Sequence, residues 1–159
     1  NGREINNYSQ DELADVRNKM LGFIFQQYNL LPKLTVLENV ELPLLYAGLS
    51  DAEQEKRALA SLDRVGLKSK AKNHPTQLSG GQQQRTSIAR ALINNPSLVL
   101  ADEPTGNLDS KSSEEVMSIL KMCNQSYGQT VIMITHNLDI AKQADRIITI
   151  SDGKIVEEA

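Results

Sequence analysis

The sequence predicts an α/β fold built around a mainly parallel sheet. Two apolar runs, at residues 98–101 and 131–135, continue without alternating polar side chains, which is typical of strands buried on both faces of a parallel sheet. A third apolar run at 21–25 also indicates a buried strand, and helical patterns separate the three runs, as expected for α/β proteins. The length of 159 residues suits one domain with a substantial core.

Helix-capping signals order the elements around these strands. Residues 9–12 and 50–53 both read Ser-x-x-Glu, the pattern of a capping box, and Thr35 can cap a helix that Pro43 bends or ends. The other predicted elements are helices at 79–93 and 112–122 and strands at 147–150 and 155–156, with hairpin-turn signals at Asp152-Gly153 and Asn1-Gly2.

Composition excludes several classes of protein. The net charge of −3 gives no case for nucleic-acid binding through bulk electrostatics. The one cysteine, Cys123, cannot form an internal disulfide, which fits a cytosolic compartment. No stretch approaches the roughly 20 apolar residues of a membrane span. Because the first residue is Asn1 and not Met, we expect a processed chain or a fragment of a longer one.

Residues 78–85, Leu-Ser-Gly-Gly-Gln-Gln-Gln-Arg, place two glycines at the start of a predicted helix. The first amides of a helix have no intrahelical partner, and the helix dipole adds positive potential there. Gly80 and Gly81 would let an anion approach the backbone, and the Ser79 hydroxyl adds a donor, so the run predicts a phosphate site. A bare Ser-Gly-Gly is more often a simple turn before a helix.

Polar side chains follow each of the three central strands. Gln26 follows the first, Asp102 and Glu103 end the second, and His136 closes the third. Ligand sites in parallel sheets lie at such carboxyl ends. Taken singly, each residue has a plainer interpretation, as a solvated acid at a turn, a surface histidine or a polar surface glutamine. Gln27 competes with Gln26 for the same role.

Together, the run 78–85, the Asp-Glu pair with residues 104–109, and the lone histidine resemble the ABC-type ATPases that drive membrane transporters. The resemblance implies a P-loop NTPase-like sheet with an inserted α-helical subdomain. Residues 1–159 would be a single incomplete ABC ATPase domain, with 1–27 and 95–159 as the α/β core. Residues 28–94 would form the helical subdomain that ends in the signature helix.

The resemblance also implies a role for each site residue. Asp102 would hold Mg²⁺, Glu103 would act as general base toward water, and His136 would contact the γ-phosphate of ATP and orient Glu103. Gln26 would reach Mg²⁺ and the water. The remaining nucleotide contacts would come from Ser79, Gly80, Gly81 and Gln82, which meet ATP held by the opposite subunit, and from Asp109, which connects the two sites of a dimer.

The implied partners are a second ATPase subunit, arranged head to tail, and a transmembrane permease that contacts the region 26–46. The implied location is cytoplasmic, peripheral at the inner face of the cell membrane. The wording of residues 29–48 and 101–109 is most similar to the branch that contains the macrolide-export, lipoprotein-release and cell-division ATPases.

The family's P-loop, Gly-x-x-x-x-Gly-Lys-Ser/Thr, is absent from residues 1–159, because the one Gly-Lys pair, Gly153-Lys154, is followed by Ile155. We therefore expect an N-terminally truncated domain that is inactive or nearly so alone. The missing P-loop strand is expected beside the strand that ends at Asp102, and its loss is expected to cause self-association. The alternatives are a non-catalytic remnant or interaction module, and a non-transport ABC ATPase of DNA repair or translation.

Overall fold

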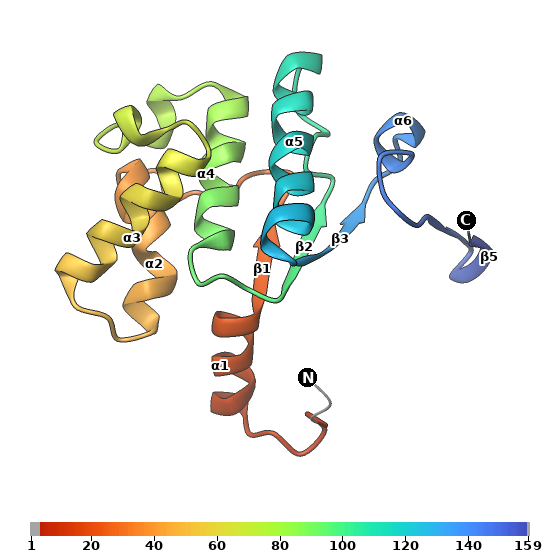
Figure 1. Cartoon of the computed structure of the whole chain (residues 1–159), viewed down its shortest axis with the longest axis horizontal. Helices are drawn as coiled ribbons and strands as arrows, with labels where there is room; N and C mark the ends of the chain where they lie inside the picture. The colour runs from red at the N-terminus through yellow and green to blue at the C-terminus, as the bar shows by residue number, and fades with distance from the viewer. Residues whose placement is uncertain (1–3, 159) are drawn as a thin grey trace.

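The computed structural model describes residues 4–158 and centres on a three-stranded parallel sheet (Figure 1). Its strands are β1 (Leu21–Ile24), β2 (Leu98–Asp102) and β3 (Thr130–Ile134), in the order β1-β2-β3. The parallel register pairs Phe23 with Leu100, and Leu100 with Ile132. The three carboxyl ends therefore meet at one edge, and the prediction of an α/β fold with a parallel sheet is confirmed.

The helices are α1 (Gln10–Met20), α2 (Val36–Tyr46), α3 (Asp51–Arg64), α4 (Gly80–Leu92), α5 (Ser110–Tyr127) and α6 (Leu138–Ala141), with short 3-10 turns η1 (Lys68–Lys70) and η2 (Pro75–Gln77). In Figure 1, α2, α3 and α4 lie to the left of the sheet and α5 lies in front of it, while α1 lies below β1 and α6 lies beyond β3. Helices α2, α3 and α4 pack on one another, and α4 joins this layer to β1 and α5. Within the described residues, no helix combines the length and the apolar character that crossing a bilayer requires.

A two-stranded antiparallel hairpin, β4 (Ile148–Ser151) and β5 (Lys154–Glu158), stands apart from the main sheet (Figure 1). Its turn has left-handed backbone at Asp152 (φ 50°) and Gly153 (φ 74°), which is the turn chemistry that the sequence predicts. The other hairpin-turn signal, Asn1-Gly2, lies outside the described residues.

One face of the sheet forms the core with α4 and α5. Side chains alternate along a strand, so Ile24, Val99 and Ala101 share this face, and all three are buried. They belong to one apolar cluster with Ile88 of α4 and Val116 of α5. This packing fixes where the strand ends lie relative to the start of α4.

The opposite face of the sheet is open among the described residues. Phe23, Ile132 and Ile134 lie on it and are 38%, 50% and 63% exposed. Phe23 stacks on Phe25, with ring centroids 6.1 Å apart. The prediction that continuous apolar strands are buried on both faces is therefore wrong for this part of the chain, where helices cover one face only.

The expected position of a further strand beside β2 is also wrong. Strand β2 pairs with β1 along one edge and with β3 along the other, from Leu98 to Asp102. Both rows of backbone hydrogen-bonding groups on β2 are thus occupied. The outer edges of this sheet belong to β1 and β3.

Two local predictions differ from the structure. Ser50 precedes α3 as expected, but its side chain makes no cap hydrogen bond, and the Glu53 carboxylate pairs with Arg57 (Oε1 to Nε, 2.6 Å). Pro43 does not end α2, which continues to Tyr46. The carbonyl of Pro43 accepts a hydrogen bond from Asn18 Nδ2 at 3.1 Å, which ties α2 to the residues before β1.

Candidate functional site

The carboxyl edge of the sheet brings together four of the predicted site residues. Gln26 lies just beyond β1, Asp102 ends β2 with Glu103 next to it, and His136 lies two residues beyond β3. Parallel pairing is the reason, because Ile24 is opposite Ala101, and Asp102 is opposite Ile134. The sheet thus assembles residues that are more than a hundred positions apart in the chain.

Glu103 is the most constrained residue at this edge. Its backbone is left-handed (φ 44°), which is unusual for a residue with a Cβ and is common where strain is held at a functional site. The Glu103 amide donates to Ile134 O at 2.9 Å, and Gly106 N donates to Glu103 O at 3.1 Å. These backbone bonds hold the turn that presents the carboxylate.

The Glu103 carboxylate is bound by the segment after β3. Oε1 accepts a hydrogen bond from the His136 amide at 2.9 Å and lies 2.6 Å from His136 Nδ1, while Oε2 accepts from Thr135 Oγ1 at 3.2 Å. The His136 ring is 83% exposed and the Glu103 side chain 18% exposed. The pair therefore has one sheltered member and one that faces solvent.

These contacts set the charge state of Glu103. Partial burial raises the pKa of the carboxyl, but hydrogen bonds from the side chain and amide of His136, the attraction of its ring, and the Thr135 hydroxyl together outweigh that effect and leave the pKa below its usual value. Glu103 is therefore a carboxylate at neutral pH and can accept a proton or a hydrogen bond. Thr135, which sequence reasoning missed, has no distinguishing motif and is found only through this contact.

Gln26 lies against the loop that follows Glu103. A Cβ placed on Gly106 would lie 2.8 Å from Gln26 Nε2, so any larger residue there would displace the Gln26 side chain. The Gln26 carbonyl accepts a hydrogen bond from Asn107 Nδ2 at 3.3 Å. Gln27, the alternative from the sequence, is exposed. Packing thus favours Gln26, to which the family resemblance gives the role, over its competitor Gln27, and it adds Asn107 as a contact that sequence reasoning missed.

The Ser-Gly-Gly-Gln run starts α4, as predicted. Ser79 is the N-cap, with its Oγ accepting from Gln82 N at 3.3 Å and Gln82 Oε1 accepting from Ser79 N at 3.0 Å. The capping box uses the Ser79 and Gln82 side chains, so, within the described residues, the amides of Gly80 and Gly81 are the donors left without a protein partner. Such a helix start suits an anion.

Asp109 caps α5 directly beside the start of α4. Its Oδ1 accepts from Ser112 N at 2.9 Å, and its Oδ2 accepts from Ser112 Oγ at 2.8 Å. Ser112 in turn touches Gly81, where an added Cβ would lie 2.5 Å from Ser112 Oγ. The fold therefore brings Asp109 to the signature run through Ser112, a residue that the sequence did not single out.

The donors at the sheet edge fit a magnesium ion that binds together with a nucleotide. Within residues 4–158, no group of three His, Cys, Asp or Glu side chains is arranged to hold a metal by itself. Mg²⁺ in nucleotide sites takes one or two protein oxygen donors and completes its shell with phosphates and water. The Asp102 carboxylate and the Gln26 amide oxygen are donors of this kind.

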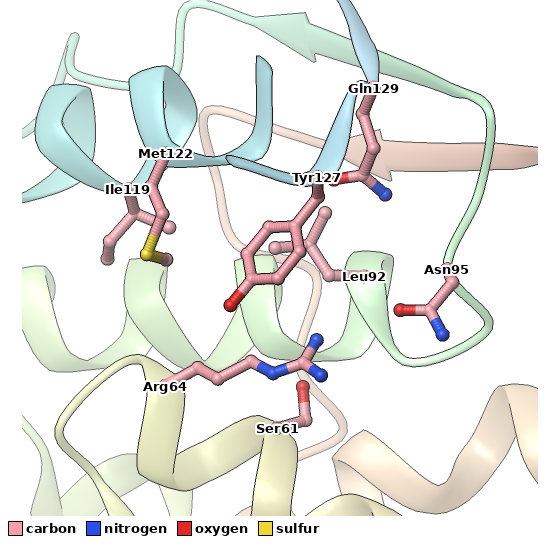
Figure 2. A pocket seen from close by; sticks show the side chains of 8 residues that line it. All are labelled: Ser61, Arg64, Leu92, Asn95, Ile119, Met122, Tyr127 and Gln129. Atoms are coloured by element: carbon pink, nitrogen blue, oxygen red, sulfur yellow. The ribbon is translucent and has the colours of Figure 1, made fainter. Parts of the chain in front are cut away.

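A small pocket elsewhere holds none of the predicted site residues. It lies between α3, α4 and the end of α5, and its lining includes Ser61, Leu92 and Gln129 (Figure 2). The Arg64 guanidinium lies over the Tyr127 ring, with Cζ 5.0 Å from the ring centroid. This cation–π contact joins α3 to α5, and we assign the pocket to the packing of those helices.

Comparison with known proteins identifies the family. A family model described as "ABC transporter" matches residues 1–106. The macrolide export ATP-binding/permease protein MacB of Pasteurella multocida is 54% identical over 158 residues, which are 99% of this chain and 24% of that protein. An uncharacterized ABC transporter ATP-binding protein of Methanocaldococcus jannaschii is 50% identical over 157 residues, which are 96% of this chain and 67% of that protein.

The fold agrees with solved structures. A dimeric structure of a post-hydrolysis state of the ATP-binding cassette MJ0796 bound to ADP and Pi matches with a TM-score of 0.86 at 48% identity, over 97% of this chain and 68% of that one. The chain therefore belongs to the ABC transporter family, and the family that its motifs predict is confirmed. It spans about a quarter of the length of the macrolide-export relatives that it matches (24%).

Proposed function

We propose that this chain is the ATP-binding part of an ABC transporter and that the full-length protein that contains it hydrolyses MgATP between two subunits. The observation that supports this best is the Glu103 carboxylate, held by His136 and Thr135 at the carboxyl edge of a parallel sheet. The same edge of the sheet offers oxygen donors for Mg²⁺ at Asp102 and Gln26, and the start of α4 at Gly80 and Gly81 offers an anion-binding site to the second subunit.

In this proposal Glu103 is the general base. Water attacks the γ-phosphorus, its proton passes to Glu103, the bond from the γ-phosphorus to the bridging oxygen breaks, and ADP leaves with that oxygen. The Nδ1–H of His136 donates to the carboxylate and fixes its orientation, which leaves Nε2 for the nucleotide. Bound Mg²⁺ neutralises the charge that develops on the phosphates.

The test is Glu103→Gln in the full-length protein that contains these residues. We expect phosphate release to fall by about 100-fold or more, since a positioned base contributes roughly that factor. Binding of ATP should persist, because phosphate contacts are kept, and closed dimers should accumulate on size exclusion. Glu114→Gln, at an exposed acid on α5, is the matched control. Turnover that survives Glu103→Gln, or falls equally in the control, would contradict the assignment.

Ser79, Gly80, Gly81 and Gln82 are proposed to meet the γ-phosphate of ATP held by the second subunit, with Asp109 linking the two sites. Ser79→Arg should therefore stop both hydrolysis and dimer closure, because a long cation at the cap blocks the start of α4. Subunits that still close with MgATP would refute the role. A mixture of Ser79→Arg and Glu103→Gln subunits separates the role of Ser79 in the signature from the role of Glu103 as general base. In each mixed dimer, the one intact signature belongs to the Glu103→Gln subunit and faces the intact Glu103 of the other subunit.

The membrane partner is proposed to contact residues 26–46, which run from the end of the α/β core into a helical subdomain 28–94. This segment exposes Leu31 (48%), Leu45 (57%) and Tyr46 (81%), more apolar surface than a loop and helix end need. A cysteine placed at Tyr46 should cross-link to the permease, while the buried Cys123 stays unreactive. Cross-linking from a cysteine at the exposed Arg57 of α3, and not from position 46, would exclude this surface.

A further inference from the structure

The turn that follows Gln26 has an unfavourable backbone. Tyr28 (φ 62°) and Asn29 (φ 48°) are both left-handed, and two consecutive residues with a Cβ rarely adopt this conformation without outside support. Within the turn, Tyr28 N donates to Phe25 O at 3.2 Å, and Asn29 N donates to Gln27 O at 2.6 Å. These short-range bonds use the amides of Tyr28 and Asn29, so their carbonyls can accept hydrogen bonds from other groups.

Arg90 of α4 supplies that support. Its Nη2 donates to Tyr28 O at 2.9 Å, and its Nη1 donates to Asn29 O at 2.7 Å. A guanidinium offers parallel donors in one plane, which matches two adjacent carbonyls in a way that a lysine ammonium does not. Burial lowers the pKa of Arg90, and, among the described residues, no carboxylate forms a salt bridge with it. The carbonyls therefore stabilise the buried cation.

The turn continues into a second anchored stretch. Asn39 of α2 is fully buried; its Oδ1 accepts from Leu31 N at 2.7 Å, and its Nδ2 donates to Leu31 O at 3.0 Å and Thr35 O at 2.9 Å. The segment after Gln26 is thus fastened by Arg90 of α4 and then by Asn39 of α2. Both contacts join the segment to helices that pack beside the sheet.

Tyr28 then reaches the start of α4. A Cβ placed on Gly80 would lie 3.0 Å from the Tyr28 hydroxyl oxygen and 3.9 Å from Cζ, so the phenol rests directly on the glycine. Burial raises the pKa of Tyr28, which keeps the hydroxyl neutral. At the other end of the turn, Gln26 touches Gly106 in the loop after Glu103. One short turn therefore contacts both the helix start and the loop after Glu103.

We propose that Arg90 is a positioning residue, which holds the turn at residues 26–29 so that Tyr28 contacts Gly80 and Gln26 contacts Gly106. Within one subunit, the turn connects the two ends of α4. Arg90, near the carboxyl end of the helix, fixes the turn, and Tyr28 of the turn contacts Gly80 at the amino end of the helix. Movement of Gln26 is transmitted through Tyr28 to the signature glycine. The expected effect on catalysis rests on the proposed ATPase function, whereas the first test of the proposal requires no ATP hydrolysis.

The first test is hydrogen exchange on the full-length protein without nucleotide. Arg90→Met keeps the aliphatic stem and loses the donors, and we expect amides 26–29 to exchange about tenfold faster, because the charged hydrogen bonds that hold the turn are gone. Arg57→Met, which removes a guanidinium bound only to Glu53, is the control. Unchanged exchange at 26–29 in folded Arg90→Met overturns the clamp. If Arg90→Met does not fold, Arg90→Lys takes its place.

The second test asks whether Tyr28 bears on Gly80. Gly80→Ala should lower phosphate release, and Tyr28→Phe added to it should restore at least half, because the atom that the new methyl meets is the phenol oxygen. A methyl that acted directly on the nucleotide would not be rescued, and absence of rescue overturns this step.

The third test separates positioning from folding. Arg90→Met should lower kcat about tenfold while KM for ATP changes less than twofold, because a misplaced Gln26 affects the reacting water more than nucleotide binding. An equal fall for Arg57→Met would overturn it. If the wild-type protein does not hydrolyse ATP, the proposed function fails, while the exchange result still decides the clamp.

Discussion

At the scale of single residues, Glu103 joins backbone strain to a fixed charge state. A left-handed residue with a Cβ costs roughly 1–2 kcal/mol, and the turn at Glu103 is held by bonds to Ile134 and Gly106. The same turn directs the carboxylate toward His136, so the contact between Glu103 and His136 depends on the strained backbone of Glu103. Asp102, one residue earlier, keeps strand geometry and is exposed at the strand end. Adjacent acids thus differ in backbone, burial and partners.

The first prediction concerns pH. Glu103 has a lowered pKa in the folded state, so its hydrogen bonds stabilise the fold above the ordinary carboxyl value of 4.5, and this stabilisation is lost as pH falls through the lower, folded pKa. Glu103→Gln should therefore be less stable than wild type by about 1 kcal/mol near neutral pH. The difference in stability between wild type and Glu103→Gln should narrow once the pH drops below 4.5. Thermal melts across pH test this; a gap that widens in acid contradicts it.

The second prediction concerns Cys123. The thiol is fully buried in the core on α5, and burial raises its pKa to about 11. The thiolate is the reactive form, so we expect iodoacetamide at mildly alkaline pH to label Cys123 only after the protein unfolds. Mass spectrometry with and without denaturant checks this. Rapid labelling of the native protein, at a rate near that of a free thiol, would show that the α5 face opens readily.

Sequence reasoning could predict the candidate site residues because their types and spacing follow strand ends and a helix start. It could not find the contacts of Thr135, Asn107, Tyr28 or Arg90, since these join residues up to 81 positions apart and leave no local pattern. It kept Gln27 as a competitor of Gln26, because adjacent glutamines differ only in which one packs on Gly106. Long-range polar contacts of this kind depend on the finished fold.

At the scale of elements, the local capping signals differ in outcome. Ser9 and Thr35 each form the capping hydrogen bond at the helix start that the sequence predicts. Ser50 does not, and the Glu53 carboxylate, which would complete the capping box there, pairs with Arg57 four residues later. Pro43 is tolerated inside α2.

The third prediction concerns the contact of α4 with β1. A Cβ placed on Gly22 would lie 2.7 Å from the Ala91 carbonyl oxygen and 3.1 Å from Pro96 Cγ. Backbone cannot rotate away as a side chain can, so Gly22→Ala should push α4 from the sheet at a cost of about 1–3 kcal/mol. Urea unfolding measures this, with Ser126→Ala on the exposed surface of α5 as control. A cost equal to the control would show that α4 can shift freely.

At the scale of the whole molecule, the arrangement of layers explains what the strand pattern could not. Apolar runs without alternation predict two buried faces, and the residues on the second face are indeed apolar, but no described element covers them. The sequence shows which side chains are apolar enough to be buried. Whether they are buried depends on which elements pack against that face of the sheet. The parallel direction, in contrast, follows from helices that return the chain to the same edge.

The last prediction concerns association of the 159-residue polypeptide. Its sheet exposes Ile132 and Ile134 on β3, which lies at a sheet edge. Open edges and apolar faces recruit other chains, so light scattering without nucleotide should show concentration-dependent association. Ile132→Thr with Ile134→Thr should reduce it, because threonine keeps β propensity while removing apolar area. Ile5→Thr is the matched control, since Ile5 is as exposed as Ile132 (50% each) and lies outside the sheet. If the control reduces association as much as the β3 pair, contact is nonspecific; if the polypeptide stays monomeric at high concentration, the open face does not drive assembly.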